Sequence, residues 1–534
     1  MIWMDTQARP HSTVRSALVD TSIFRWLFRF ALCLSAAVML YGLNEPLLDQ
    51  HAFRQTQTAI SAWRIGSTWN ILDYETPVLG HPWSVPMEFP IYQTVTAVLA
   101  KVTPLPLEAC GRLVSWLAMA AVLFPLRRIL LHLQKDEGEA LFLLSATLYL
   151  ASPQYLFWGR SFMMETSALF LSMLFLWRAI RLVDSPTSWN LACCSLWGIL
   201  AGLTKITTFP AFVAASLCYV FWKRRRDGMV TPCGILGLGF AVAVALGCFL
   251  AWNAHADALK ASHPVAYMIT SQSLHAWNFG TLEQRLSGQF WEWTVWRNMI
   301  PAILGGQSAV FLLVALTVSA LFRTRFHLGL AAVLGLLFLL PMLVFTNLHL
   351  VHNYYQTANA IFLLAAAAVL LHSLLLQGKG LLAVAAMASI LVGMSVEFMD
   401  APLTSIRMAG SDRTLRIADV VRANTRRDSG LIVLGLDWSS EIHYYAQRKG
   451  LALPRDSGPH VARELAEEPS KLLGGLSVGA LVVCPDRRVD AGALERLSEV
   501  ILSRLPAMWS TKVEDCTVFC NGKARAERLY DSVR

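Results

Sequence analysis

The sequence predicts an all-α polytopic membrane protein with about eleven transmembrane helices and a small C-terminal α/β domain outside the cytoplasm. Of the 534 residues, 55% are hydrophobic and only 15% are charged, whereas soluble proteins carry about 25% charged residues. Between residues 24 and 398, apolar runs recur that are long enough to cross a bilayer, where about 20 residues suffice. These observations exclude a soluble enzyme, a fibrous or disordered protein, and a single-span receptor.

Eleven apolar segments are predicted to span the membrane. They are roughly residues 24–43, 111–132, 138–157, 164–182, 189–204, 206–222, 232–252, 302–322, 328–347, 357–376 and 380–398. A further apolar segment, residues 90–103, is only about 14 residues long, which is short for a crossing. We expect it to lie in the membrane interface as an amphipathic helix.

The basic residues predict the orientation of the chain. With this count of spans, the basic span ends fall on the same side as the N-terminus: Arg127, Arg128, Arg178, Arg181, Lys223 to Arg226, Arg323, Arg325 and Lys379. Cytoplasmic loops are enriched in Lys and Arg, so residues 1–23 are predicted to be a cytoplasmic tail of a protein in the inner (plasma) membrane. The net charge of +9 therefore marks topology, and no nucleic-acid partner is predicted.

Residues 24–398 form the predicted membrane module, with long outer loops at 44–110 and 253–301. Residues 399–534 form the predicted α/β domain, which this topology places in the periplasm. Apolar runs at 431–436, 481–485 and 516–520 predict strands, and residues 440–448 and 494–505 predict helices. No glycine-rich motif opens a helix there, so nothing indicates nucleotide binding.

Three of the ten cysteines, Cys484, Cys516 and Cys520, lie in this domain without metal-type spacing. A disulfide between Cys516 and Cys520 is disfavoured, because four residues along one strand separate the two side chains by too great a distance. Whether any of the three cysteines forms a disulfide is left open.

Ionisable residues at membrane depth are costly and often functional, and in the predicted topology they gather on the outer side. They are Asp49, Arg54, Glu88, Arg160, Glu165, Lys205 and His352. Each has an ordinary explanation as a helix cap, an interfacial ion pair or a snorkelling side chain, but these explanations do not account for the common side. A transporter places such groups near the midplane, whereas an outer rim suits an enzyme acting on a lipid-borne substrate.

The run from Asp49 through His51, Arg54 and Gln55 to Ala59 resembles the first-loop motif of type C glycosyltransferases. The most similar subgroup is the bacterial relatives of protein O-mannosyltransferase and of the lipid A aminoarabinose transferase. Further similar segments follow in the family's order, at 88–92, 153–165, 202–205 and 352–355, and the tail segments 434–439 and 444–450 resemble appended outer domains. The resemblance covers about residues 20–450.

The resemblance implies a GT-C fold and inverting transfer of a sugar from an undecaprenyl (polyprenyl) phosphate carrier to a lipid, glycan or protein acceptor, as in lipopolysaccharide or protein glycosylation. Asp49 matches the first acidic position and is expected to be the general base that takes the acceptor's proton. Glu165 matches the second acidic position and is expected to be a second catalytic residue that orients the acceptor or Arg160. Groups expected to hold the carrier phosphate or sugar are His51, Arg54, Gln55, Glu88, Arg160, Lys205, His352, Tyr354 and Tyr355.

Gln50 follows Asp49 where the family often has a second acidic residue. A lone carboxylate beside a histidine is a poor site for a hard cation, so no metal ligand is assigned and no cofactor is firmly implied. Two alternatives stay open: a polysaccharide ligase or polymerase that uses a diphosphate-linked glycan, and a lipid or solute transporter. The sugar and the acceptor are not specified.

Overall fold

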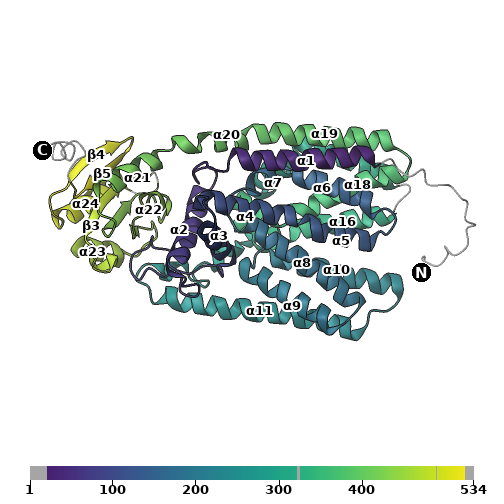
Figure 1. Ribbon diagram of the computed structural model, residues 1–534, viewed down its shortest axis with the longest axis horizontal. Helices are drawn as coiled ribbons and strands as arrows, with labels where there is room; N and C mark the ends of the chain where they lie inside the picture. Colours follow the sequence, from purple (N-terminus) through teal and green to yellow (C-terminus); the bar gives the residue numbers. More distant parts are fainter. Residues whose placement is uncertain (1–20, 322–324, 487, 489, 523–534) are drawn as a thin grey trace, which may run out of the picture.

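The computed structural model describes residues 21–321, 325–486, 488 and 490–522. A long helical bundle carries an α/β unit at one end (Figure 1). Most of the predicted cytoplasmic tail, residues 1–20, lies outside the described residues.

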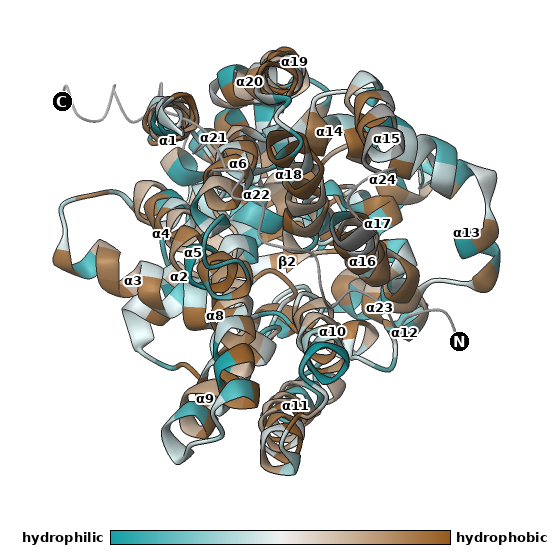
Figure 2. Ribbon diagram, turned by 90° about the vertical axis from the view of Figure 1, so that its right-hand side faces the viewer, coloured by the Kyte–Doolittle hydropathy of each residue, from teal (hydrophilic) through white to brown (hydrophobic). Residues whose placement is uncertain are grey.

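Each predicted span coincides with a helix or a broken pair of helices. These helices are α1 (Ser22–Tyr41), α4 (Leu107–Ala121), α5 (Leu123–Leu133), α6 (Gly138–Ala151), α7 (Pro153–Trp158), α8 (Glu165–Asp184), α9 (Ser188–Thr204), α10 (Phe209–Asp227), α11 (Pro232–Ala261), α14 (Ile300–Leu304), α15 (Gln307–Leu321), α16 (Arg325–Val344), α18 (Ala360–Leu376) and α19 (Gly380–Met399). Hydrophobic residues make up much of the helices seen end-on (Figure 2), and many of them are exposed, such as Leu236 and Leu250 of α11, as expected where lipid replaces water.

Within the described part of the chain, six helices are long and apolar enough to cross a membrane, or seven if one bent pair is a single span. Three other apolar helices, α3, α6 and α18, are shorter, at 12 to 17 residues. The number of eleven spans therefore stays a prediction, while the structure shows a bundle with several helices long and apolar enough to cross a membrane.

Polar side chains join three helix ends that the positive charges marked as cytoplasmic. At the ends of α5, α8 and α10, His132 Nε2 lies 2.5 Å from Asp184 Oδ2, and Tyr219 Oη donates to Asp184 Oδ1 over 2.8 Å. Lys223 forms an ion pair with the same carboxylate. The three basic helix ends are thus held on one side of the bundle.

The first outer loop contains α2 (Ala52–Thr68) and α3 (Ile91–Val102). In α3, Val95, Val98 and Val102 are exposed, whereas Tyr92 and Thr96 are buried. An apolar exposed face on a helix of 12 residues fits the predicted interfacial position.

The other connections near this end consist of short helices. They are η1 (Ala266–Ile269), α12 (His275–Phe279), α13 (Leu282–Leu286) and the π-helix η2 (Gln289–Met299) in the second loop, and α17 (Thr346–Val351) and η3 (Asn353–Ala358) before α18. α11 continues to Ala261, so its last two turns replace the start of the loop expected from residue 253.

A five-stranded sheet organises the α/β unit, with strand order β2-β1-β3-β5-β4. β2, β1 and β3 are parallel, and β5 and β4 continue the sheet antiparallel. The elements are α20 (Ala401–Met408), η4 (Ala409–Ser411), α21 (Arg413–Asn424), β1 (Gly430–Leu434), α22 (Glu441–Ala446), β2 (Gly450–Ala452), α23 (Pro459–Glu467), η5 (Lys471–Leu473), β3 (Val478–Val483), α24 (Ala491–Ser503), β4 (Trp509–Val513) and β5 (Cys516–Cys520).

The first outer loop completes the edge of this sheet. Gly80 N donates to Gly450 O over 2.9 Å, and Ala452 N donates to Val78 O over 2.8 Å. Side chains of the loop and of the sheet share one hydrophobic core, in which Leu79 packs with Leu451 and Ile432. The α/β unit is therefore built onto the loop that carries the predicted site.

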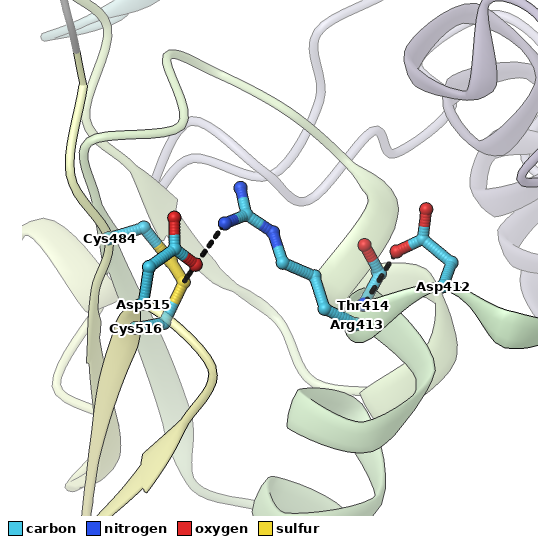
Figure 3. The surroundings of a disulfide bond; sticks show 6 residues. All are labelled: Asp412, Arg413, Thr414, Cys484, Asp515 and Cys516. Atoms are coloured by element: carbon cyan, nitrogen blue, oxygen red, sulfur yellow. Dashed lines mark hydrogen bonds and ion pairs between the residues drawn. A yellow bond between two sulfur atoms is a disulfide. The ribbon is translucent and has the colours of Figure 1, made fainter.

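The sheet register also determines the disulfide. Val483 of β3 pairs with Thr517 of β5, which brings the adjacent Cys484 and Cys516 together with their Cα atoms 4.3 Å apart, and the two are bonded (Figure 3). Beside this bond, Arg413 forms an ion pair with Asp515 (Figure 3). Cys516 thus pairs across strands, in agreement with the argument against a Cys516–Cys520 bond.

The pH dependence of the α/β unit is expected to depend on Glu441, the first residue of α22. Burial raises the pKa of Glu441 to about 7, and the neighbouring Asp412 acts in the same direction. The folded state therefore keeps the carboxyl protonated while the unfolded chain loses the proton near the ordinary glutamate pKa of about 4.3, so stability falls as pH rises from there to about 7. Hydrogen exchange of residues 413–446 should show Glu441→Gln better protected than the wild type at pH 8, with the difference nearly gone at about pH 4, below the ordinary glutamate pKa; equal protection at both pH values would contradict this.

Candidate active site

A sharp turn places the predicted site at the end of the bundle beneath the α/β unit. His51, the residue before α2, has left-handed backbone angles of φ 53° and ψ 44°. This turn reverses the chain that leaves α1 and directs the first turn of α2, with Arg54 and Gln55, back toward the helix ends. The predicted residues then fall into two groups.

The first group, the Asp49 cluster, consists of Asp49, Gln55, Arg112 and Arg160. Arg160 Nη2 donates to Asp49 Oδ2 over 2.5 Å, and Arg112 Nη2 lies 3.8 Å from the same oxygen. Gln55 Nε2 donates to Asp49 Oδ1. Because the Asp49 side chain has 0% exposure, its charge is compensated entirely within the protein.

Arg112 was not predicted as a site residue. Its guanidinium group donates to the backbone oxygens of Glu45 and Pro46, the latter over 3.0 Å, and so fixes the chain that leads to Asp49. The signal was present in the sequence, since Arg112 is a charged residue at the start of a predicted span, where charges are rare and usually paired.

The second group, the Arg54 cluster, contains the other eight predicted residues. It holds two ion pairs, Arg54 with Glu88 and Lys205 with Glu165, and His51, His352, Tyr354 and Tyr355 pack around them. The charges of Arg54 and Lys205 both act on Glu88, so the two pairs form one electrostatic unit. Its members come from the start of α2, the chain just before α3, α8, the end of α9 and the segment between α17 and α18.

Aromatic rings line the Arg54 cluster. The Lys205 Nζ atom lies 4.2 Å from the centre of the Tyr355 ring and 5.1 Å from that of Tyr354. The His51 ring centre lies 5.2 Å from that of His352 and 5.0 Å from that of Tyr354. The two tyrosine rings thus cover the ammonium group with low-polarity surface, which strengthens its interaction with an anion.

The Glu88 and Glu165 carboxylates differ in solvent exposure. Glu88 has a side-chain exposure of 26%, compared with 4% for Glu165. Burial raises the pKa of Glu88, but the charges of Arg54 and Lys205 outweigh it and hold the net pKa below the usual value. Glu88 is therefore an ionised carboxylate that a ligand can reach.

The neighbouring histidine is kept neutral. Burial, together with the charges of His51, Arg54 and Lys205, lowers the pKa of His352 to about 3. At neutral pH its imidazole is uncharged and offers one donor and one acceptor.

The α/β unit holds the loop that carries both clusters. Leu47 N donates to Tyr445 Oη over 2.6 Å, and Ser440 Oγ lies 2.8 Å from Thr56 Oγ1. The Phe53 and Trp438 rings meet edge to face with centres 4.9 Å apart. Residues just before and within α22 thus contact the chain on both sides of Asp49.

This arrangement suits the binding of a phosphate ester beside a proton acceptor. Arg54 and Lys205 provide positive charge, and Glu88 is ionised and reachable. In the described part of the chain, no three His, Cys, Asp or Glu side chains gather closely enough to hold a metal ion.

The sequence matches no protein-family model and no curated protein, but its structure resembles solved membrane proteins. ArnT from Cupriavidus metallidurans bound to undecaprenyl phosphate aligns over 94% of this chain and 98% of its own, with a TM-score of 0.62 and 13% identity. The chain has the type C glycosyltransferase fold. The apo form of the same ArnT aligns over 93% and 98% of the two chains, with a TM-score of 0.59 and 11% identity.

A third structure agrees with this assignment of the fold. The Archaeoglobus fulgidus oligosaccharyltransferase, in complex with Zn and sulfate, aligns over 93% of this chain and 73% of its own, with a TM-score of 0.50 and 10% identity. The resemblance to type C glycosyltransferases that the sequence motifs indicated is therefore confirmed at the level of the fold.

Removing the Asp49 charge should destabilise the protein. In Asp49→Asn two buried guanidinium groups lose their shared counter-charge, and breaking a buried pair in this way costs about 3–5 kcal/mol. Unfolding in SDS–detergent mixtures would measure the loss. Asp73→Asn is the matched control, since Asp73 lies in the same loop with 49% exposure and should change stability by at most ~0.5 kcal/mol. Equal stability of the two variants would contradict this role for Asp49.

Proposed function

We propose that this protein is an integral-membrane glycosyltransferase that moves a sugar from an undecaprenyl (polyprenyl) phosphate carrier to a lipid, glycan or protein acceptor, with inversion. The observation that carries the proposal is the Arg54 cluster, where two cations lie beside one ionised and reachable carboxylate. The fold shared with ArnT, which was solved bound to undecaprenyl phosphate, supports the class of carrier.

The reaction forms one bond and breaks another. The acceptor hydroxyl oxygen attacks the anomeric carbon while the bond from that carbon to the carrier phosphate breaks, and the carrier leaves as its phosphate. The hydroxyl proton passes to a carboxylate. Arg54 and Lys205 stabilise the charge that grows on the departing phosphate, Arg54 by two N–H groups and Lys205 as a point charge.

Two carboxylates compete for the role of general base. Asp49 has the expected position in the motif, but its side chain is fully buried and paired with Arg160. Glu88 lies in the Arg54 cluster with access from outside. We propose that Glu88 takes the proton and that Asp49 positions Arg160 and the first turn of α2.

We further propose that the site faces the periplasm from the inner membrane. Disulfides persist mainly in oxidising compartments outside the cytoplasm, and the Cys484–Cys516 bond lies in the α/β unit at the same end as the site. The basic residues at the opposite helix ends give the same orientation.

Transfer should depend on Glu88. In Glu88→Gln we expect the rate to fall by about 10²- to 10⁴-fold, the usual contribution of a general base, while undecaprenyl phosphate still binds. Because the pKa of Glu88 is lowered, the wild-type rate should fall only below the ordinary glutamate pKa of about 4.3. A purified enzyme assay with labelled carrier-linked sugar measures both.

The Asp49→Asn variant discriminates between the two carboxylates. If it abolishes transfer at unchanged stability while Glu88→Gln remains active, Asp49 is the base. Transfer assays with monophosphate-linked and diphosphate-linked donors separate this function from a ligase or polymerase, because only the ligase or polymerase would use the diphosphate-linked glycan. Flux into liposomes without any glycan product would indicate a transporter instead.

The orientation can be tested with C-terminal reporters. A fusion of alkaline phosphatase after residue 534 should be active, since the α/β unit is predicted to be periplasmic. A fusion of a fluorescent protein that matures only in the cytoplasm should be dark at the same position. A reagent that labels free thiols, read out on non-reducing gels, should not label Cys484 or Cys516 in the wild type. In Cys484→Ser, Cys516 loses its disulfide partner and should become labelled. A fluorescent fusion with both cysteines reduced would contradict the periplasmic assignment.

A further inference from the structure

Arg54 is held by two acceptors of different strength. Its Nη2 forms the ion pair with Glu88 Oε1, and its Nη1 donates to Gln57 Oε1 over 2.6 Å. A guanidinium group that pairs fully with a carboxylate uses two nitrogens. The pair between Arg54 and Glu88 is one-sided, because Gln57 occupies the second nitrogen.

The Gln57 amide has only one possible orientation. An arginine offers donors only, so the amide oxygen of Gln57 must face Arg54 and its Nε2 must face away. Gln57 follows Arg54 by three residues on α2, which brings the two side chains to the same face of the helix. Since the amide is uncharged, it orients the guanidinium group without cancelling more of its positive charge.

A small cavity lies beside the Gln57 amide, between α2, α3 and the chain that joins these neighbouring helices (Figure 1). Its volume is about 10 Å³, which is about the space that one water molecule needs. Gln57 and Gln93 line the cavity from α2 and α3, and Gln57 Nε2 and Gln93 Oε1 are buried without a hydrogen-bond partner among the described residues. One water that accepts from Gln57 and donates to Gln93 satisfies both amides.

Three hydroxyl groups of the cavity wall differ from the two amides, because they have partners within the protein. Ser61 Oγ lies 2.9 Å from Thr76 Oγ1, and Thr58 Oγ1 donates to the backbone oxygen of Arg54 over 2.9 Å. Thr58 thus lines the same cavity without touching the Arg54 guanidinium group. It offers a matched control for Gln57.

The one-sided pair keeps Arg54 ready for a phosphate group. Charge-assisted hydrogen bonds are about twice as strong as neutral ones. A phosphate oxygen therefore displaces the neutral Gln57 amide from Nη1 more readily than it would displace a second carboxylate oxygen. Without the amide, Nη1 would turn to Glu88 and complete a bidentate pair.

From these contacts we propose that Gln57 is a positioning residue of the site. It keeps Arg54 from pairing with Glu88 through both nitrogens and so leaves Nη1 to the carrier phosphate. Gln93 supports this position through one water bound to the Gln57 amide, and both glutamines act through Arg54. The proposal rests on the proposed function, which places the carrier phosphate at Arg54 and Lys205.

Binding of undecaprenyl phosphate to the full-length protein in nanodiscs tests the proposal, with thermal stabilisation as the measure. We expect Gln57→Met to bind this carrier about tenfold more weakly than the wild type, because Arg54 pairs with Glu88 through both nitrogens. Glu88→Gln should bind it at least as tightly as the wild type. In the double variant Gln57→Met/Glu88→Gln, binding should return to within about twofold of Glu88→Gln, because no carboxylate competes for Arg54.

The double variant separates positioning from a structural role. If Gln57 only filled the protein interior, its loss would weaken binding equally with and without the Glu88 carboxylate. Gln93→Met should weaken binding about threefold, with the same dependence on Glu88, since the Gln57 amide loses its bridging water. Thr58→Val, the matched control in the same cavity wall, should bind the carrier as the wild type does.

The failures are distinguishable. If the wild type does not bind undecaprenyl phosphate, the proposed function itself is wrong. If the wild type binds and Gln57→Met binds equally well, or if the double variant stays as weak as Gln57→Met, the inference is overturned. An equal loss in Thr58→Val overturns it as well. Should Gln57→Met not fold, Gln93→Met decides: a loss that depends on Glu88 supports the inference, and unchanged binding overturns it.

Discussion

The buried Asp49 carboxylate is the interaction on which the site depends. It lies between Arg160, which follows α7, and Arg112 of α4, and Gln55 of α2 binds its other oxygen. One anion thereby connects two parts of the bundle to the loop that carries the Arg54 cluster. Because charges so far from water are stable only when paired, this loop has a single favourable position, and that position brings Arg54 to Glu88 and His51 to His352 and Tyr354.

The α/β unit restrains the same loop on the side away from the bundle. Tyr445 and Ser440 hold the chain before and after Asp49, and the sheet takes residues 77–80 of the same loop as an edge. The loop is therefore enclosed between the bundle and the sheet. The α/β unit is thus part of the scaffold of the site, and acts on it through contacts with the loop backbone.

Sequence patterns predicted the helices well because each apolar run carries its own signal. They also placed Arg54, Glu88, Lys205 and Glu165 on one side, since the charges at helix ends follow topology. The burial of Asp49 was not predictable, because its partner Arg160 lies 111 residues away. β2 and β4 were missed for local reasons: β2 has three residues, and β4 alternates exposed with half-buried positions.

The sheet edge formed by residues 77–80 has a consequence for biosynthesis. Leu79 pairs with Leu451, so the first loop meets its partner strand only after most of the chain has been made. At about 5–20 residues per second, the loop waits roughly 20–70 s after its own synthesis. During that time the α/β unit does not yet shield the apolar residues of the loop and the arginine pairs around Asp49 from solvent. Maturation of the site is therefore a late event, completed when the last part of the chain reaches the loop made near its beginning.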